Sequence, residues 1–195
     1  MRTAAFLDRD GVVNVDHGYT VRVPEFQFIA GVLPAARRLH EAGFALVIVT
    51  NQSGIGRGYY SEADFHALTD WMRARFAEAG APLAGVYFCP HHPTDAIGEY
   101  RRDCDCRKPA PGMLLAAARD LSLDLEHSVM FGDRASDLQA AAAAGVPTRI
   151  LLGTNGISEP LADVPAAWVT ARYKTLSDAV GEFLAAPSAV PVSGR

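Results

Sequence analysis

The sequence predicts an α/β fold: a doubly wound parallel sheet with helices on both faces. Short apolar runs, each long enough for one buried strand, alternate along the chain with segments of helical periodicity. Several of these runs end in acidic, hydroxyl or amide side chains, at the edge of the sheet where open α/β folds bind their ligands. With 195 residues, of which 49% are hydrophobic, the chain can form one well-buried domain. We expect that domain to span residues 1–186 and the Pro- and Ser-rich residues 187–195 to be disordered.

The expected strands are apolar runs without polar alternation, as in strands that are buried on both faces. Five such runs stand out, and a sixth would lie at an edge of the sheet. They span residues 4–7, 44–49, 86–88, 128–132, 148–152 and, for the edge strand, 168–170.

The expected helices show apolar residues at helical spacing and residue types that begin or end helices. Ser61 is an N-cap, with Asp64 in the capping-box position. Gly43 and Gly145 follow periodic segments as C-terminal caps. The segment 15–30 has no clean period and is expected to form a flap near the ligand crevice. Helices are expected to begin near Val32, Ser61, Pro111 (as the first helical residue), Asp137 and Leu176.

Composition and charge exclude several classes of function. The net charge of −4 offers no basic surface for a nucleic-acid backbone, and no apolar run is long enough to cross a bilayer. The first residues lack the layout of a signal peptide. All three cysteines lie between residues 89 and 106, and an odd number cannot pair completely, which argues for a reducing compartment. We therefore expect a cytoplasmic monomer with no nucleic-acid or membrane partner.

The first strand ends in two acids, Asp8 and Asp10, which are separated by one residue and followed by Gly11. Both carboxylates can reach the same crevice, and Gly11 lets the backbone turn sharply beside a ligand. The alternative is that the two acids are solvated turn residues, which is common for Asp next to Gly.

Later segments add complementary groups. The second strand ends in Thr50, the fourth ends in Asp133 with Asp137 four residues on, and Lys108 stands just before a helix. Carboxylate oxygens make a hard site that suits Mg²⁺. A metal, a lysine and a hydroxyl around a carboxylate nucleophile make a phosphoryl-transfer site. The acids after the fourth strand could instead stabilise a helix N-terminus.

A second cluster of chemically active residues lies in the segment 89–108, after the third strand. Its three cysteines and a histidine provide four ligands, enough for a closed tetrahedral zinc site with a structural role. The four residues are Cys89, His91, Cys104 and Cys106. His92 is a rival ligand, and buried thiols beside a surface histidine are the simpler alternative. Zinc would staple the loop that delivers Arg107 and Lys108 to the crevice.

Four motifs occur in the order in which one enzyme family carries them. They are Asp8-Arg9-Asp10-Gly11, Val49-Thr50-Asn51, Lys108-Pro109 and Gly132-Asp133-x-x-x-Asp137. On these motifs the chain resembles the haloacid dehalogenase-like phosphohydrolases. The resemblance covers residues up to about 150 and implies a core sheet with strand order 3-2-1-4-5. No insertion in the sequence is long enough to form a large cap domain.

The resemblance implies a role for each motif residue. Asp8 would attack phosphorus and become an aspartyl phosphate, and Asp10 would protonate the leaving oxygen and then activate water. Mg²⁺ would be held by Asp8, Asp133 and the main-chain carbonyl of Asp10. Thr50 and Lys108 would hold the phosphoryl oxygens. The neighbouring charge of Asp8 predicts a raised pKa for Asp10, which suits a proton donor.

Further motifs narrow the resemblance within the family. They are Asn14 to Tyr19, Thr50 to Ile55, Cys89 to Pro93 and Cys104 to Pro109. These segments are similar to the phosphatases of a heptose 1,7-bisphosphate, and less closely to the histidinol-phosphate phosphatases. This resemblance selects His91 over His92 as the zinc ligand.

Substrate binding is expected from the loops around the crevice. The resemblance implies as substrate-binding residues Asp16, His17, Gly18, Tyr19, Thr50, Asn51, Gln52, Ser53, Arg107, Lys108 and Arg134. Arg107 and Arg134 are candidates for a second phosphate, because guanidinium matches phosphate geometry. Asp137 would orient Lys108 or a metal-bound water.

The resemblance therefore implies a Mg²⁺-dependent phosphatase that acts on a small phosphorylated sugar. It would remove the C7 phosphate of a heptose bisphosphate, in nucleotide-heptose or lipopolysaccharide biosynthesis. Histidinol phosphate, which lacks a second phosphate, is the alternative substrate. A non-catalytic, zinc-stapled binding module is the alternative from another class. A DNA 3′-phosphatase is disfavoured because neither a basic stripe nor an aromatic stacking platform is visible.

Overall fold

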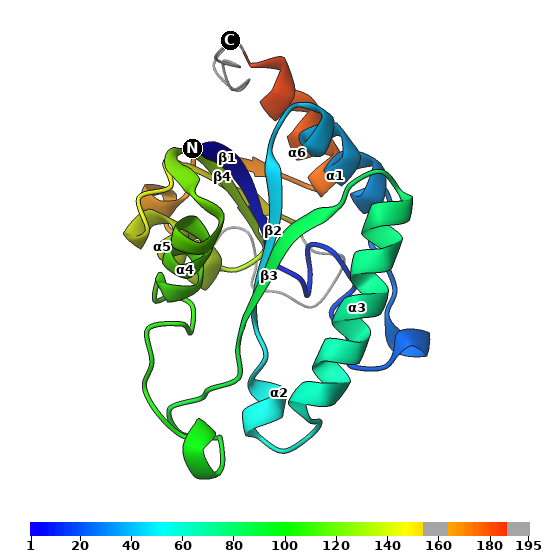
Figure 1. The fold of residues 1–195 in the computed structure, drawn as a ribbon. Helices are drawn as coiled ribbons and strands as arrows, with labels where there is room; N and C mark the ends of the chain where they lie inside the picture. Colours follow the sequence, from blue (N-terminus) through cyan, green and yellow to red (C-terminus); the bar gives the residue numbers. More distant parts are fainter. Residues whose placement is uncertain (154–163, 187–195) are drawn as a thin grey trace.

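The structure, a computed structural model, describes residues 1–153 and 164–186. These residues form a six-stranded sheet with the order β3-β2-β1-β4-β5-β6 (Figure 1), and all neighbouring strands are parallel. The predicted doubly wound parallel sheet with the order 3-2-1-4-5 is confirmed, and an edge strand, β6, lies beside β5. The strands are β1 (Arg2–Leu7), β2 (Ala45–Asn51), β3 (Leu83–Cys89), β4 (Leu123–Gly132), β5 (Thr148–Leu152) and β6 (Ala171–Tyr173).

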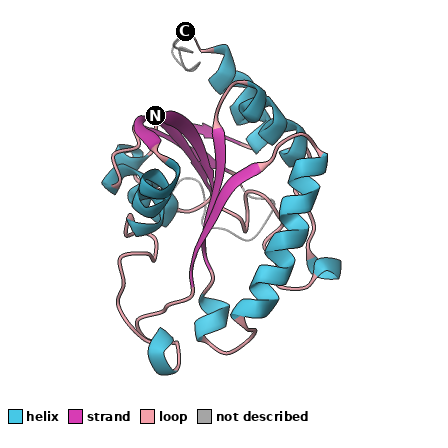
Figure 2. Cartoon of the chain, viewed as in Figure 1, coloured by secondary structure: helices cyan, strands magenta, loops and turns pink. Residues whose placement is uncertain are grey.

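Helices cover both faces of this sheet (Figure 2). On one face lie α1, α3 and α6, and on the other lie α4 and α5. The helices are α1 (Val32–Glu41), α2 (Ser53–Gly56), α3 (Glu62–Glu78), α4 (Gly112–Leu121), α5 (Ala135–Ala143) and α6 (Leu176–Ala185), with 3₁₀ turns at Val23–Glu25, Gly98–Tyr100 and Ala166–Trp168.

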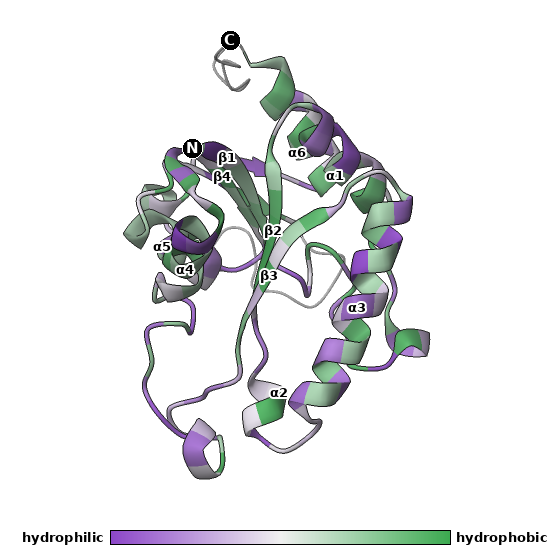
Figure 3. Cartoon of the chain, in the orientation of Figure 1, coloured by the Kyte–Doolittle hydropathy of each residue, from purple (hydrophilic) through white to green (hydrophobic). Residues whose placement is uncertain are grey.

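Strand β1 shows why the chain forms two apolar layers. Successive side chains of a strand point to opposite faces, so Ala5 and Leu7 join the core under α1, α3 and α6, whereas Ala4 and Phe6 join the core under α4 and α5. All four side chains are fully buried. Figure 3 shows β2 as hydrophobic over most of its length, while α3 carries both hydrophobic and hydrophilic residues.

Several predicted boundaries differ from the observed ones. The edge strand expected at 168–170 is wrong: Trp168 ends a 3₁₀ turn, and β6 begins at Ala171, which pairs with Ile150. The backbone N–H of Thr170 bonds the carbonyl of Arg149, so ladder pairing begins only at this point. Pro111 is the N-cap of α4 rather than its first helical residue.

Other elements agree with the sequence-based prediction, were not predicted, or lie outside the described residues. The capping box of Ser61 and Asp64 is confirmed at the start of α3. The short helix α2 was not predicted, because four residues are too few for helical periodicity. The tail expected at 187–195 lies outside the described residues.

The order of the strands determines where a ligand can bind. The chain proceeds outward from β1 to β2 and β3, then returns to place β4 on the other side of β1. Such a switch leaves a crevice at the carboxyl ends of the two central strands, where the following loops diverge. The loops after β1, β2 and β4 therefore surround the candidate site. In the described part of the chain, no helix is both long and apolar enough to cross a membrane.

The capping box of α3 gives a first testable prediction. The Ser61 side chain accepts a hydrogen bond from the Asp64 backbone N–H (3.1 Å). We expect Ser61→Ala to lower the free energy of unfolding by about 1 kcal/mol, because that N–H loses its partner. Urea unfolding measures the change, and Ser61→Thr, which keeps the hydroxyl, is the control. Equal stability of Ser61→Ala and the wild type would show that the cap contributes nothing.

Candidate active site

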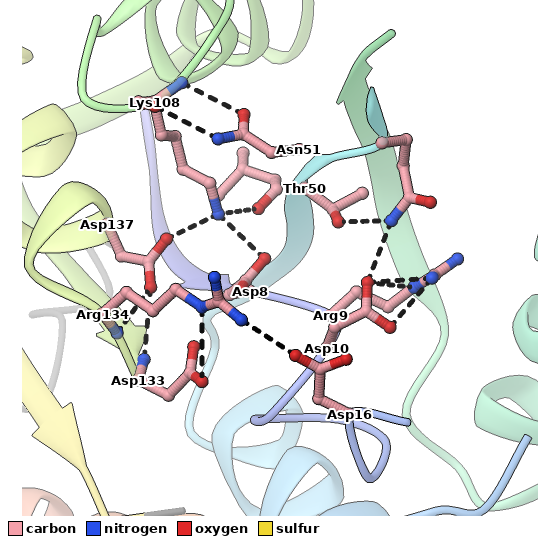
Figure 4. Close-up of polar contacts among 12 residues, drawn as sticks. Asp8, Arg9, Asp10, Asp16, Thr50, Asn51, Lys108, Asp133, Arg134 and Asp137 are labelled. Atoms are coloured by element: carbon pink, nitrogen blue, oxygen red, sulfur yellow. Dashed lines mark hydrogen bonds and ion pairs between the residues drawn. The ribbon is translucent and has the colours of Figure 1, made fainter. Parts of the chain in front are cut away.

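A cavity of about 560 Å³ opens at the carboxyl ends of β1, β2 and β4. Figure 4 shows the polar side chains that converge there. The cavity is lined by Asp8, Asp10, Asp16, Gly18, Tyr19, Thr50, Asn51, Gln52, Ser53, Tyr60, Arg107, Lys108, Pro109, Arg134, Ser136 and Asp137. Four segments that are far apart in the sequence thus supply one pocket, as the strand-end motifs predicted.

A buried ion-pair cluster forms the floor of the cavity. The Lys108 ammonium lies 2.8 Å from an Asp8 oxygen and 2.6 Å from an Asp137 oxygen, and it donates to the Val49 carbonyl (2.8 Å). Each of the three charged side chains is at most 9% exposed. Burial would lower the pKa of Lys108, but the two carboxylates outweigh burial and raise it, so the ammonium form persists.

Asp8 is the candidate nucleophile. Burial is the largest influence on this carboxyl, and it raises the pKa of Asp8 to about 6 against the attraction of Lys108. A carboxylate held in such a dry position is poorly solvated, which leaves its oxygen available for attack. Lys108 is therefore well placed to keep Asp8 ionised before a phosphate enters.

Asn51 fastens the loop that carries Lys108 to the end of β2. Its amide nitrogen donates to the Lys108 carbonyl and its amide oxygen accepts from the Lys108 N–H, both at 3.1 Å. This two-point bond fixes the backbone of Lys108 across 57 residues of sequence. The Asn51 side chain thus positions the lysine as well as lining the cavity.

Carboxylates at the ends of β1 and β4 form a donor set for a hard cation. Oxygens of Asp8, Asp133 and Asp137 lie within 4.8 Å of one another. Asp137 is already engaged, because one of its oxygens pairs with Lys108 and the other accepts from the backbone N–H groups of Asp133 and Arg134. Asp8 and Asp133 are thus the carboxylates that fit Mg²⁺, whose ligands are oxygens.

Gly11 makes this approach of acids possible. A Cβ atom at residue 11 would lie 2.2 Å from a carboxylate oxygen of Asp133, and Gly11 has a φ of +90°. Any other residue would both clash with the acid and strain the backbone. The glycine that follows the two acids of the first motif is therefore required by the packing of the site.

Asp10 lies beside Asp8 but in a different environment. Burial alone would raise the pKa of Asp10, yet the ion pair with Arg9 and hydrogen bonds from Asn14 and Gln52 outweigh burial and lower it. The Arg9 guanidinium reaches both carboxylate oxygens, at 2.9 and 2.8 Å. The raised pKa that the sequence predicted for Asp10 is therefore wrong. Arg9, the buried residue between the two acids, dominates over the charge of Asp8.

The flap brings some of its expected residues to the cavity and leaves one outside. Asp16 accepts a hydrogen bond from Arg134 (2.9 Å), and Gly18 and Tyr19 line the cavity. His17 instead lines a neighbouring hollow between the flap and α3. Arg134 therefore bridges the flap to the end of β4, and its guanidinium also lies 4.0 Å from Asp133.

Sequence reasoning missed three residues that line the cavity. Tyr60, Pro109 and Ser136 reach it from segments that were assigned to helix starts or to a motif flank. Tyr60 directly precedes the N-cap Ser61, so its local sequence signals only the beginning of a helix. Only the packing of α2 and α3 brings its hydroxyl to the site.

The Cys/His cluster lies next to this cavity, in the segment 89–108. The three Sγ atoms are 3.1 to 3.6 Å apart, and the Nδ1 atom of His91 lies 3.3 Å from Cys106 and 3.7 Å from Cys89. His92 turns away and accepts hydrogen bonds from the backbone N–H groups of Thr94 and Asp95. The four predicted residues therefore converge, and the rival His92 does not join them.

A carboxylate nucleophile, a buried lysine and acidic residues at the carboxyl ends of a doubly wound sheet are the features of the haloacid dehalogenase-like hydrolases. Comparison with known proteins agrees with this class. The HAD-hydrolase-like family profile matches residues 105–179.

Curated relatives resemble nearly the whole chain. The D-glycero-β-D-manno-heptose-1,7-bisphosphate 7-phosphatase of Yersinia pestis is 50% identical over 183 residues, covering 88% of this chain and 97% of the relative. The protein of the same name from Escherichia coli K12 is 50% identical over 177 residues, with coverage of 91% and 93%. A crystal structure of the D,D-heptose 1,7-bisphosphate phosphatase of B. bronchiseptica, complexed with magnesium and phosphate, matches with a TM-score of 0.80. Its sequence identity is 36%, with coverage of 94% of this chain and 98% of that chain. The chain belongs to this family of heptose bisphosphate phosphatases.

The ion pair of Arg9 with Asp10 gives a second prediction. Arg9 is 1% exposed, so its removal leaves an Asp10 carboxylate without its main counter-charge. We expect Arg9→Leu to lower the free energy of unfolding by roughly 3 kcal/mol, because a mostly buried charge loses its partner. Arg37→Leu, which breaks an exposed pair with Glu41, is the control and is expected to cost less than about 0.5 kcal/mol. Urea unfolding at neutral pH compares the two, and equal losses would contradict the special role of Arg9.

Proposed function

We propose that this protein is a Mg²⁺-dependent phosphatase that removes the C7 phosphate from D-glycero-β-D-manno-heptose 1,7-bisphosphate. The observation that carries the proposal is the buried Lys108, which pairs with Asp8 at the floor of a cavity that is large enough for a small phosphorylated sugar. Family membership supplies the substrate, because relatives that are 50% identical bear its name. The reaction would belong to nucleotide-heptose synthesis, as the resemblance implies.

In the proposed reaction Asp8 attacks phosphorus, the bond to the sugar oxygen breaks, and an aspartyl phosphate forms on Asp8. Lys108 and the Thr50 hydroxyl hold the phosphoryl oxygens during the transfer, in a buried position where such interactions are strong. Asp8, Asp133 and the main-chain carbonyl of Asp10 would hold Mg²⁺. When bound, the cation supplies positive charge that lets an anionic nucleophile approach an anionic phosphate.

Asp10 is the proposed acid and base. Its lowered pKa keeps it ionised in the free protein, the form that takes a proton from the water that hydrolyses the aspartyl phosphate. For the first step it must be protonated. The negative charge of an entering phosphate raises the pKa of a neighbouring carboxyl, so substrate binding itself favours the acid form.

The second phosphate of the substrate calls for cationic groups away from Asp8. Arg107 and Arg134 both line the cavity. Arg107 donates to the His91 carbonyl (3.2 Å), and Arg134 pairs with Asp16. Histidinol phosphate would leave such a second site without a ligand.

We further propose that Cys89, His91, Cys104 and Cys106 hold a structural zinc ion. Four protein ligands close the coordination sphere, so the ion would staple the loop without taking part in the reaction. The Nε2 atom of His91 lies 2.8 Å from the Arg102 guanidinium. With a metal on Nδ1, Nε2 carries a proton and cannot accept from Arg102, so metal binding requires Arg102 to move away.

Phosphate release tests the proposed activity. With Mg²⁺ present, we expect faster turnover of the β-heptose 1,7-bisphosphate than of the α-anomer or of histidinol phosphate. Asp8→Asn, which keeps the shape of the side chain but not its nucleophilic charge, should reduce release to background. Preference for histidinol phosphate would keep the reaction and overturn the substrate. Full turnover by a folded, metal-loaded Asp8→Asn protein would overturn the mechanism.

Metal analysis tests the zinc site. We expect about one zinc ion per chain in the wild type, and loss of that zinc in Cys104→Ser, because removal of one of four ligands weakens a closed site. Thr94→Val, in the same loop but outside the cluster, is the control and should retain zinc. A wild-type chain that folds normally and contains no zinc would overturn the proposed zinc site.

A further inference from the structure

The Gln52 side chain links three residues of the site. Its amide nitrogen donates to an Asp10 oxygen (3.0 Å) and to the Thr50 hydroxyl (2.8 Å). Its amide oxygen accepts from the Tyr60 hydroxyl (2.6 Å). Gln52 is 2% exposed, so every polar group of its side chain is bonded within the protein.

Chemistry fixes the direction of this chain of hydrogen bonds. An ionised carboxylate can only accept, so the nitrogen of Gln52 must face Asp10 and its oxygen must face Tyr60. Tyr60 must then donate. Burial is the largest influence on this phenol and raises the pKa of Tyr60 to about 12, so the hydroxyl keeps its proton at neutral pH.

The same chain orients Thr50. Because the Thr50 oxygen accepts from Gln52, its own proton is free to point elsewhere. Thr50 lines the cavity, where a phosphoryl oxygen is the acceptor that the proposed function supplies. A reversed Gln52 amide would place its oxygen against Asp10, where the two would repel, and would ask Thr50 to donate away from the cavity.

The Tyr60 ring is held firmly enough to control the amide. A Cβ atom on Gly54 would lie 2.3 Å from this ring, so the ring packs directly on the backbone of α2. Tyr60 also directly precedes Ser61, the N-cap of α3. Its ring therefore lies against α2 while its backbone leads into α3.

We propose that Tyr60 is a positioning residue for the phosphatase reaction: through Gln52 it holds the Asp10 carboxylate in place and directs the Thr50 hydroxyl toward the phosphate. Tyr60 acts on the reacting groups only through Gln52. This inference rests on the proposed function, since Asp10 and Thr50 matter only if phosphate is transferred at Asp8.

A pair of variants in two backgrounds tests the inference. Tyr60→Phe removes one hydroxyl and keeps the ring. On the heptose bisphosphate we expect it to lower kcat by about three- to tenfold, the effect of one lost hydrogen bond, with little change in KM. In a Gln52→Met background, Tyr60→Phe should change kcat by less than about twofold, because the residue through which it acts is gone. Tyr87→Phe, which removes a hydroxyl near exposed Asp120, is the control.

Three results would overturn the inference: an unchanged kcat in Tyr60→Phe, an equal loss in both backgrounds, or a raised KM at constant kcat, which would indicate a substrate contact. A wild type that releases no phosphate would overturn the proposed function instead.

A measurement that needs no turnover still tests the contact between Tyr60 and Gln52. In ¹⁵N-labelled protein, the Gln52 side-chain amide protons, assigned by their absence in Gln52→Met, should exchange slowly in the wild type and faster in Tyr60→Phe. Equal exchange rates in the wild type and in Tyr60→Phe would contradict the proposal that the Tyr60 hydroxyl holds the Gln52 amide in place.

Discussion

The floor of the site depends on the buried positive charge of Lys108. Lys108 lies between Asp8, at the end of β1, and Asp137, in the first turn of α5. Without the ammonium, two carboxylates would face each other in a dry environment, which strongly disfavours their charged forms. The lysine thus allows the carboxylates of Asp8 and Asp137 to stand close together. The Val49 carbonyl and the Asn51 side chain hold that lysine in place.

Two neighbouring acids are given opposite surroundings. Asp8 is buried and shares Lys108 with Asp137, and burial raises its pKa. Asp10 accepts hydrogen bonds from Arg9 on both carboxylate oxygens and from the side-chain amides of Asn14 and Gln52, and its pKa is lowered. Both acids follow the end of β1, where the backbone turns and gives each side chain different partners. The proposed roles, a nucleophile in Asp8 and a proton carrier in Asp10, therefore rest on the side chains that surround each acid.

The segment 89–108 connects the Cys/His cluster to the ion-pair cluster around Lys108. Its thiols and imidazole converge a few residues before Arg107 and Lys108, and Asn51 ties the backbone of Lys108 to β2. A loop of this length would otherwise carry large conformational freedom. The convergence of these side chains within the loop and the two-point bond of Asn51 at its end restrict that freedom where the chain brings Lys108 to a buried position.

Sequence alone determined those features of this protein that depend on residues close together in the chain. Buried strands, the cap at Ser61, the acids at strand ends and the gathering of three cysteines near a histidine follow from periodicity, side-chain chemistry and spacing. The choice of His91 over His92 came from the family resemblance, and in the structure His91 is the histidine that lies beside the thiols. Tertiary structure decided the effects that residues far apart in the sequence have on one another in the folded protein. The direction of the pKa shift of Asp10, the place of His17 outside the cavity and the arrival of Tyr60 depend on partners that only folding brings near. Electrostatic effects between side chains are set by distance and burial, and a sequence records neither.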